Sequence, residues 1–233
     1  MPKPHAATAQ HLREWASSCG FALSLEADAL GVRIDLAEPR LGFHHSFVSG
    51  PLSKRARQPD QLLLKACSNR QRSIQSVLDL TCGWGVDGFM LARHGHAVTM
   101  LEQNHLVHAV VAWSLQQLAA DAAQAQVKGE LRIERADALE YLQAMPADQQ
   151  FDCIYLDPMF AAHKSGAKPA KEMQILQALT VNSGIDDCFA LALRRARKRV
   201  VVKRAAKAPP LSGPKPDLVH RARTIRFDVY LVA

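Results

Sequence analysis

From residue 76 onward, short apolar runs of strand length alternate with longer stretches whose apolar residues recur at helical spacing. This alternation is typical of a doubly wound parallel sheet, because each helix carries the chain back to the start of the next parallel strand. The sequence therefore predicts an α/β fold with a Rossmann-like sheet. The expected strands are 77–80, 97–101, 131–134, 151–156 and 199–202, and the expected helices are 87–93, 105–120, 138–145, 171–179 and 186–197.

The C-terminal part of the chain departs from this alternation. Residues 218–220 and 225–232 flank a turn, which predicts an antiparallel hairpin that closes the sheet. The tract 208–216, rich in proline, is expected to be an irregular loop because proline cannot donate a backbone hydrogen bond.

The N-terminal part also lacks the strand–helix rhythm. Residues 21–25 and 30–36 alternate apolar and polar side chains like half-buried antiparallel strands, after a short helix expected over 11–18. We therefore expect two domains, a small N-terminal α+β subdomain over residues 1–70 and the main α/β domain over residues 71–233.

One helix is expected within the N-terminal subdomain. Asp60 is placed to cap a helix that runs from Gln61 through Cys67, because its carboxylate can accept hydrogen bonds from the first backbone N–H groups. The basic residues Lys54, Arg55 and Arg57 are expected in the loop that precedes this helix.

Composition excludes several classes of protein. The chain of 233 residues is 48% hydrophobic and 22% charged, which is ordinary globular composition rather than that of a long disordered protein. No apolar run approaches the roughly 18 residues of a membrane helix, and the N-terminus lacks the apolar segment of a secretory signal. Five scattered cysteines form no Cys-x-x-Cys pair, which argues against a disulfide framework or a zinc site. We expect a cytoplasmic protein without membrane or metal.

Positive charge is concentrated near the C-terminus. The net charge is +7 for the whole chain, yet residues 194–226 carry +11, because Asp217 is their single acid, so the remainder carries −4. Such asymmetry favours a surface that binds a polyanion, the alternative being a solvated helix end and a basic loop. The twelve cationic residues are Arg194, Arg195, Arg197, Lys198, Arg199, Lys203, Arg204, Lys207, Lys215, Arg221, Arg223 and Arg226.

The loop after the first strand of the main domain indicates a nucleotide cofactor. Gly83, Gly85 and Gly88 match the G-x-G-x-x-G dinucleotide fingerprint, which leaves an NAD-dependent oxidoreductase as one alternative. A carboxylate at the strand end would repel a pyrophosphate, however, whereas Asp79 and Asp87 would attract the cationic head of S-adenosylmethionine. The glycines allow the backbone to approach the ligand. The structural alternative is a tight turn with a capping aspartate.

The next two strands end in acids. Glu102 follows Gly83 by 19 residues, where a carboxylate accepts hydrogen bonds from a ribose diol. Asp137 follows the third strand, where it can receive an adenine amino group or cap the following helix.

The fourth strand ends in Asp157, Pro158, Met159 and Phe160. An Asp-Pro-x-aromatic turn can present an exocyclic amine, since the Asp157 carboxylate and the Pro158 carbonyl both accept hydrogen bonds from an –NH2 group. Phe160 can stack on the base, although a strand–turn with a hydrophobic plug would show the same pattern. Because parallel strands end at one edge of the sheet, we expect these loops to form one site for methyl transfer to a base amine.

Several motifs together carry a resemblance to a known family. They are Asp79-x-Thr81-x-Gly83-x-Gly85-x-Asp87-x-Phe89, Leu101-Glu102-x-Asn104, Tyr155-Leu156-Asp157-Pro158-Met159-Phe160, Lys171-Glu172-Met173 and Val200-Val201-Val202-Lys203-Arg204. Over residues 41–230 the chain resembles the small-subunit (16S) ribosomal RNA guanine-N2 methyltransferase J family of class I S-adenosylmethionine-dependent enzymes. The resemblance implies cofactor contacts at Val86, Asp87, Glu102, Gln103, Asp137, Ala138 and Asp157.

The resemblance also implies a substrate, the N2 amine of a guanosine in small-subunit ribosomal RNA, met as free RNA or in the assembled subunit. Asp157, Pro158 and Phe160 are the predicted catalytic residues. Lys164, Lys203 and Arg204 are the predicted RNA contacts. The alternatives are a DNA adenine or cytosine amino-methyltransferase and a non-catalytic RNA-binding protein of ribosome assembly.

Overall fold

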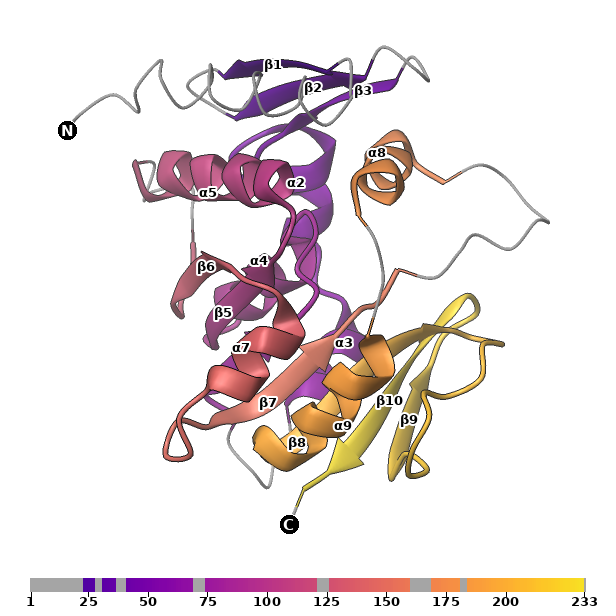
Figure 1. Ribbon diagram of the computed structural model, residues 1–233. Helices are drawn as coiled ribbons and strands as arrows, with labels where there is room; N and C mark the ends of the chain where they lie inside the picture. Colours follow the sequence, from indigo (N-terminus) through magenta and orange to yellow (C-terminus); the bar gives the residue numbers. More distant parts are fainter. Residues whose placement is uncertain are drawn as a thin grey trace. The chain divides into compact units, whose positions relative to one another are not determined.

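The computed structural model describes residues 23–27, 31–36, 41–68, 74–120, 126–159, 169–180 and 184–232 (Figure 1). The helix expected over 11–18 lies outside these residues. None of the described helices is both long and apolar enough to cross a membrane. The chain forms two compact units, one of residues 1–55, 104–126 and 162–181 and the other of residues 56–103, 127–161 and 182–233.

The larger unit contains a seven-stranded mixed sheet, as the strand–helix alternation predicts. Its strand order is β6-β5-β4-β7-β8-β10-β9, in which the first five strands are parallel and the last two run antiparallel to their neighbours. The expected C-terminal hairpin is therefore confirmed. The strands are β4 (Ser76–Asp79), β5 (Ala97–Glu102), β6 (Leu131–Arg135), β7 (Phe151–Leu156), β8 (Ala196–Ala205), β9 (Leu218–Arg221) and β10 (Ile225–Leu231).

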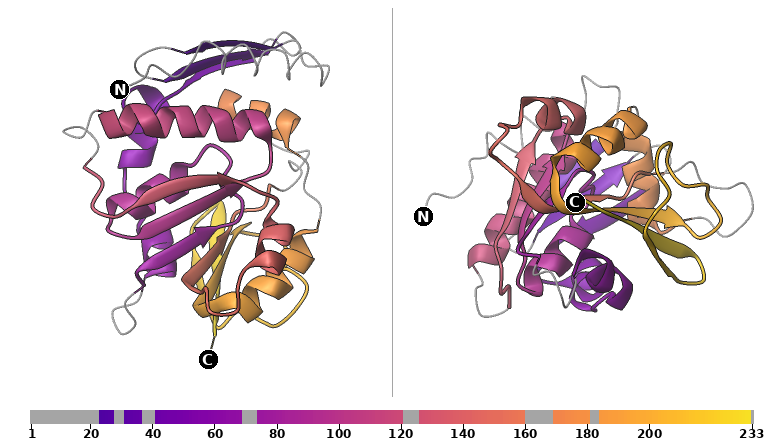
Figure 2. Two further views of the ribbon diagram at one scale, coloured as in Figure 1. Left: turned by 60° about the vertical axis from the view of Figure 1, so that its left-hand side comes forward. Right: turned by 90° about the horizontal axis from the view of Figure 1, so that it is seen from below.

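Helices cover both faces of this sheet. The helices α3 (Gln61–Cys67) and α4 (Val86–Arg93) lie on one face, and α7 (Ala138–Ala144) and α9 (Ile185–Arg195) lie on the other (Figure 2). β7 is buried along its whole length, so its alternate side chains enter both hydrophobic layers. Asp60 caps α3 as expected, since its carboxylate accepts hydrogen bonds from the N–H groups of Leu62 and Leu63.

The strand β8 is longer than the sequence predicts. The apolar run 199–202 suggested a short strand followed directly by Lys203 and Arg204. Instead β8 continues to Ala205, because it pairs with β10 from Arg199 to Ala205. Lys203 and Arg204 therefore lie inside a strand rather than in the loop beyond it.

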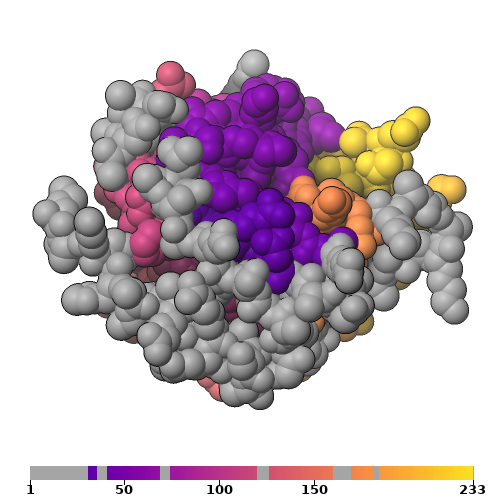
Figure 3. Space-filling view, turned by 90° about the horizontal axis from the view of Figure 1, so that it is seen from above, coloured from indigo at the N-terminus to yellow at the C-terminus, as the bar shows by residue number. Residues whose placement is uncertain are grey.

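The smaller unit contains an antiparallel sheet of β1 (Leu23–Ala27), β2 (Val32–Leu36) and β3 (Leu41–His45). The first two strands confirm the alternating pattern, and β3 was not predicted. The helix α8 (Lys171–Leu179) packs against β3, and Figure 3 shows the indigo β3 region beside the orange α8. The unit also includes α5 (His105–Ala120).

Side-chain hydrogen bonds connect the elements of the smaller unit. His45 Nδ1 lies 2.8 Å from Ser114 Oγ, which joins β3 to α5. The side-chain amide of Asn104 donates to the Leu179 carbonyl at 2.6 Å, which joins the start of α5 to the end of α8. These elements come from three separate stretches of sequence, residues 1–55, 104–126 and 162–181. The expected domain boundary near residue 70 stays a prediction.

The basic residues before Asp60 form a helix rather than the expected loop. This helix, α2 (Gly50–Arg57), contains Lys54, Arg55 and Arg57. Its Arg55 guanidinium pairs with the Glu172 carboxylate of α8 at 2.9 Å, so one of the predicted loop cations has a structural partner.

Candidate active site

Two glycines form the turn between β4 and α4, and a third lies inside α4. Gly83 and Gly85 have φ values of +52° and +72°, a backbone conformation that side chains with a Cβ atom rarely adopt. Gly88 has a different role, since a Cβ atom there would lie 2.5 Å from the Sδ atom of the buried Met100. The first two glycines thus form the turn, and the third allows α4 to pack closely on β5.

The acid of the second loop reaches this turn. The Glu102 carboxylate, at the end of β5, accepts a hydrogen bond from the Gly83 N–H group at 3.1 Å. Glu102 is only 6% exposed, so this bond partly compensates for the burial of its charge. The structure therefore brings together two residues that the sequence linked only by their spacing.

A threonine connects the loops after β4 and β7. The Thr81 N–H group donates to the Asp79 carboxylate at 3.1 Å, and the Thr81 hydroxyl oxygen accepts from the Asp157 N–H group at 2.6 Å. Thr81 thereby fixes the start of the Asp-Pro turn relative to the glycine turn. The sequence placed Thr81 in the Asp79-x-Thr81-x-Gly83 motif but gave it no role, because a hydrogen bond to the loop after β7 leaves no pattern in the sequence.

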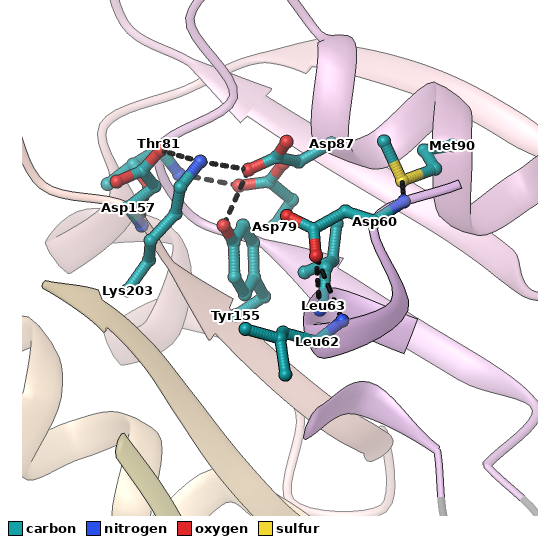
Figure 4. Close-up of polar contacts among 10 residues, drawn as sticks. All are labelled: Asp60, Leu62, Leu63, Asp79, Thr81, Asp87, Met90, Tyr155, Asp157 and Lys203. Atoms are coloured by element: carbon teal, nitrogen blue, oxygen red, sulfur yellow. Dashed lines mark hydrogen bonds and ion pairs between the residues drawn. The ribbon is translucent and has the colours of Figure 1, made fainter. Parts of the chain in front are cut away.

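Lys203 occupies the centre of the candidate site (Figure 4). Its ammonium lies 2.7 Å from Asp87 Oδ2 and 2.8 Å from Asp157 Oδ2. The Tyr155 hydroxyl donates to the same oxygen of Asp87 at 2.6 Å. One chain of contacts thus runs from Tyr155 through Asp87 and Lys203 to Asp157, across β7, α4 and β8.

The electrostatics of this cluster favour a cationic ligand. Burial raises the pKa of the Asp79 carboxyl well above its usual range, and the nearby charges of Asp87 and Asp157 add to that effect. Burial also opposes the charge of Lys203, but Asp157 and Asp87 outweigh it and raise the pKa of the ammonium. Three carboxyl groups therefore lie near one ammonium, and a cationic ligand would counter the upward shift in the pKa of Asp79 by favouring its ionised form.

The structure places the other predicted cofactor residues around the same edge of the sheet. Asp137 caps α7, because its carboxylate accepts from the N–H groups of Leu139 and Glu140. Its predicted contact with adenine remains compatible with this role. Ala138 begins α7, Val86 begins α4, and Gln103 is exposed directly after β5. Phe160 and Lys164 lie outside the described residues.

The environment of Arg204 does not match its predicted role as an RNA contact. It is only 5% exposed, and its guanidinium donates to the Pro209 carbonyl. The neighbouring Arg226 is likewise buried and pairs with Asp228 at 2.7 Å. These side chains hold the loop after β8 against the hairpin, and Lys203 is engaged by two carboxylates. The geometry therefore does not favour phosphate contacts for Lys203 or Arg204.

Five other cations of the basic segment 194–226 separate by sheet edge. Arg194 and Arg197 lie where α9 meets β8, at the amino end of the parallel strands. Lys207, Arg221 and Arg223 lie at the opposite edge, where β8 ends and β9 turns into β10. All five are exposed. The second group thus shares the sheet edge of Asp157, because β8 runs parallel to β7.

Comparison with known proteins assigns the family. A family model of SAM-dependent methyltransferases matches residues 6–232. The chain is 35% identical over 215 residues to the ribosomal RNA small subunit methyltransferase J of Thioalkalivibrio sulfidiphilus, with 91% of this chain and 81% of that protein covered. The chain belongs to the methyltransferase J family. The Coxiella burnetii member is 38% identical over 176 residues, with 74% of this chain and 66% of that protein covered.

Solved structures agree on the fold. A SAM-dependent methyltransferase from Neisseria gonorrhoeae superposes with a TM-score of 0.68 at 23% identity, and covers 99% of this chain and 93% of its own. The ribosomal RNA methyltransferase AviRa from Streptomyces viridochromogenes gives a TM-score of 0.53 at 15% identity, with 78% and 85% covered. The family assignment makes the protein a SAM-dependent methyltransferase, its sheet is Rossmann-like, and the NAD-dependent alternative is set aside.

Proposed function

We propose that this protein transfers a methyl group from S-adenosylmethionine to the exocyclic N2 amine of a guanosine in small-subunit ribosomal RNA. The names of its relatives support small-subunit ribosomal RNA as the substrate. The observation that carries the amine chemistry is the fixed Asp157 carboxyl group, which directly precedes Pro158 at the end of β7. Two anchors hold it, the Thr81 hydroxyl on its backbone and the Lys203 ammonium on its side chain.

The residues around the glycine turn fit the cofactor. S-adenosylmethionine supplies an electrophilic methyl group on a positively charged sulfur. Asp79 and Asp87 would hold its cationic end, since the site has more carboxyl groups than cations. Glu102 would accept hydrogen bonds from the ribose, beside the Gly83 and Gly85 backbone. The predicted neighbours of the nucleoside are Val86, Gln103, Asp137 and Ala138.

The chain's own contribution to the reaction is alignment. The amine of a base is a poor nucleophile because its lone pair is delocalised into the ring. Hydrogen bonds to the Asp157 carboxylate and the Pro158 carbonyl would direct that lone pair toward the methyl group. Phe160 would stack on a base that has left its helix. The methylated amine is acidic and releases its proton readily, so the site needs no strong general base.

Methylation of RNA with Asp157→Ala tests this proposal. The expected result is loss of methyl transfer from labelled S-adenosylmethionine while RNA binding persists, because phosphate contacts supply most nucleic-acid affinity. Phe160→Ala is expected to retain cofactor binding and lose turnover. Asp148→Ala, at an exposed acid in the turn before β7, is the control and should match the parent.

The choice of nucleic acid separates the proposal from its alternatives. The parent is incubated with small-subunit ribosomal RNA, assembled small subunits and duplex DNA, and nucleoside analysis of the product identifies the methylated atom. N2-methylguanosine from RNA or subunits supports the proposal. Methylated adenine or cytosine in DNA, or near-parental activity of Asp157→Ala, would contradict it.

The exposed cations at the carboxyl edge are the proposed phosphate contacts. Lys207 follows β8, and Arg221 and Arg223 lie where β9 turns into β10; adjacent strands are about 4.8 Å apart. The hairpin residues are thus about three strand spacings from Asp157, within reach of the RNA backbone next to the reacting nucleotide. A contact from Lys164 stays a prediction.

A further inference from the structure

Lys203 stands in a position that neither cofactor binding nor RNA binding explains. β7 and β8 are paired so that Leu156 lies opposite Val202, and Asp157 and Lys203 therefore follow at the same level on neighbouring strands. The Lys203 side chain is 21% exposed and the Asp157 side chain 39%. The acid is thus the more accessible of the two side chains, and the lysine is its more buried partner.

The lysine is itself fixed from the other side. Asp87 Oδ2 accepts hydrogen bonds from both the Tyr155 hydroxyl and the Lys203 ammonium. Tyr155 is fully buried in β7, so it gives Asp87 a rigid partner. Lys203 is held in place by Asp87 and bridges to Asp157, an arrangement that sets the position of the Asp157 oxygens.

The same contacts decide the charge of Asp157. The groups that face it are Asp79 at the end of β4, Asp87 on α4 and Lys203 on β8, with Tyr155 reaching it through Asp87. Burial raises the pKa of Asp157, the Lys203 charge lowers it and the Asp87 charge raises it again, so that the pKa lies above its usual value and Lys203 limits the rise. Lys203 is the cation in this set that opposes protonation.

The charge of Asp157 determines which base edge it can bind. An ionised carboxylate only accepts hydrogen bonds, whereas a protonated carboxyl offers one donor and one acceptor. Guanine presents two neighbouring donors, N1–H and the N2 amine, which match the ionised form. Adenine and cytosine present their amine beside a ring nitrogen that accepts, which matches the protonated form.

We propose that Lys203 is a positioning residue that holds Asp157 as a carboxylate toward the substrate, so that Asp157 accepts hydrogen bonds from the two adjacent N–H donors of guanine. This inference rests on the proposed function and adds to it a determinant of base selection. Lys203 is thus assigned this role in place of the phosphate contact that the sequence predicted.

The pH dependence of methylation tests the inference. Single-turnover rates at saturating cofactor are measured from about pH 5 to 9 for the parent, Lys203→Met and Lys203→Arg. Without the cation, the pKa of Asp157 rises, so the acid limb of the Lys203→Met profile is expected to move upward by about one pH unit or more. The rate of Lys203→Met should then approach the parental rate at high pH. The acid limb of the Lys203→Arg profile should lie at the same pH as that of the parent.

A merely structural lysine would give a different result. If Lys203→Met lowers the rate by the same factor at every pH, the inference is wrong. Melting temperatures identify variants that do not fold, and Lys203→Gln, of similar length, replaces Lys203→Met in that case. Absence of RNA methylation by the parent contradicts the proposed function, whereas an active parent with unshifted variants contradicts this inference alone.

A base analogue tests the selection of guanine. Once the modified guanine has been mapped with the parent, it is replaced in the RNA by 2-aminopurine, which keeps the amine but has an acceptor at N1. The parent is expected to lose at least tenfold in rate at neutral pH, and Lys203→Met is expected to lose less. Equal losses of rate in the two proteins would show that the charge of Asp157 does not determine which base is selected.

Discussion

Glu102 illustrates how one carboxylate can serve both the backbone and a ligand. Because it accepts a hydrogen bond from the Gly83 N–H group, it fixes the glycine turn as well as facing the proposed ribose position. We expect Glu102→Ala to weaken S-adenosylmethionine binding by about 1–3 kcal/mol, the range for a buried polar group left without its partner. Titration calorimetry with the cofactor measures the loss.

Two companion variants make this prediction specific. Glu102→Gln keeps an acceptor oxygen and is expected to lose less than Glu102→Ala. Glu140→Ala removes an exposed acid of α7 and should bind the cofactor as the parent does. Parental affinity of Glu102→Ala would remove Glu102 from the cofactor site.

Individual site residues differ in how far the sequence could predict them. Asp79, Glu102 and Asp157 were predictable as a group, since each stands at the end of an apolar strand and parallel strands end at a common edge. The partners of Lys203 were not predictable. They depend on the register of β7 against β8 and on the side chain of Asp87, and neither leaves a pattern in the sequence.

At the scale of elements, Asp137 has two proposed roles that substitution can separate. It caps α7, and removal of a capping side chain costs about 1 kcal/mol. Asp137→Ala should therefore lower both the stability of the protein and its affinity for the cofactor. Asp137→Ser retains a capping oxygen, so it should keep parental stability in urea unfolding. If Asp137→Ala binds the cofactor with parental affinity, Asp137 has no role in cofactor binding and only caps α7.

The elements themselves were predicted best where the pattern was regular. β7 has the predicted bounds because its apolar run is interrupted by Asp152 alone. β8 extends beyond its apolar run at both ends. Its start pairs with β7 at Ala196 and its end pairs with β10 as far as Ala205, and the charged side chains of Arg197 and Lys203 hide this pairing in the sequence. α2 was missed because a short helix rich in basic residues resembles an exposed loop.

At the scale of the whole molecule, the basic segment 194–226 is not one surface. Its charge of +11 suggested a single face for a polyanion. The strands distribute these cations to opposite edges of the sheet. Lys203 and Arg226 are held in ion pairs, and Arg199 and Arg204 are buried. Net charge thus indicated a polyanionic partner, but strand direction is needed to show which cations can meet it.

Two pairs of exposed arginines carry the same charge but lie at opposite edges of the sheet. Arg221→Ala with Arg223→Ala removes two exposed cations from the carboxyl edge, and Arg194→Ala with Arg197→Ala removes two from the amino edge. RNA binding measured at several salt concentrations is expected to weaken in the first variant, with its salt slope reduced by roughly 0.7 per lost phosphate contact. The second variant should retain the parental slope, because its cations lie away from Asp157 and Arg197 is 4.0 Å from Asp152. Equal changes in both variants would mean that the RNA responds to net charge alone, and an unchanged slope in the first would place the phosphate contacts elsewhere.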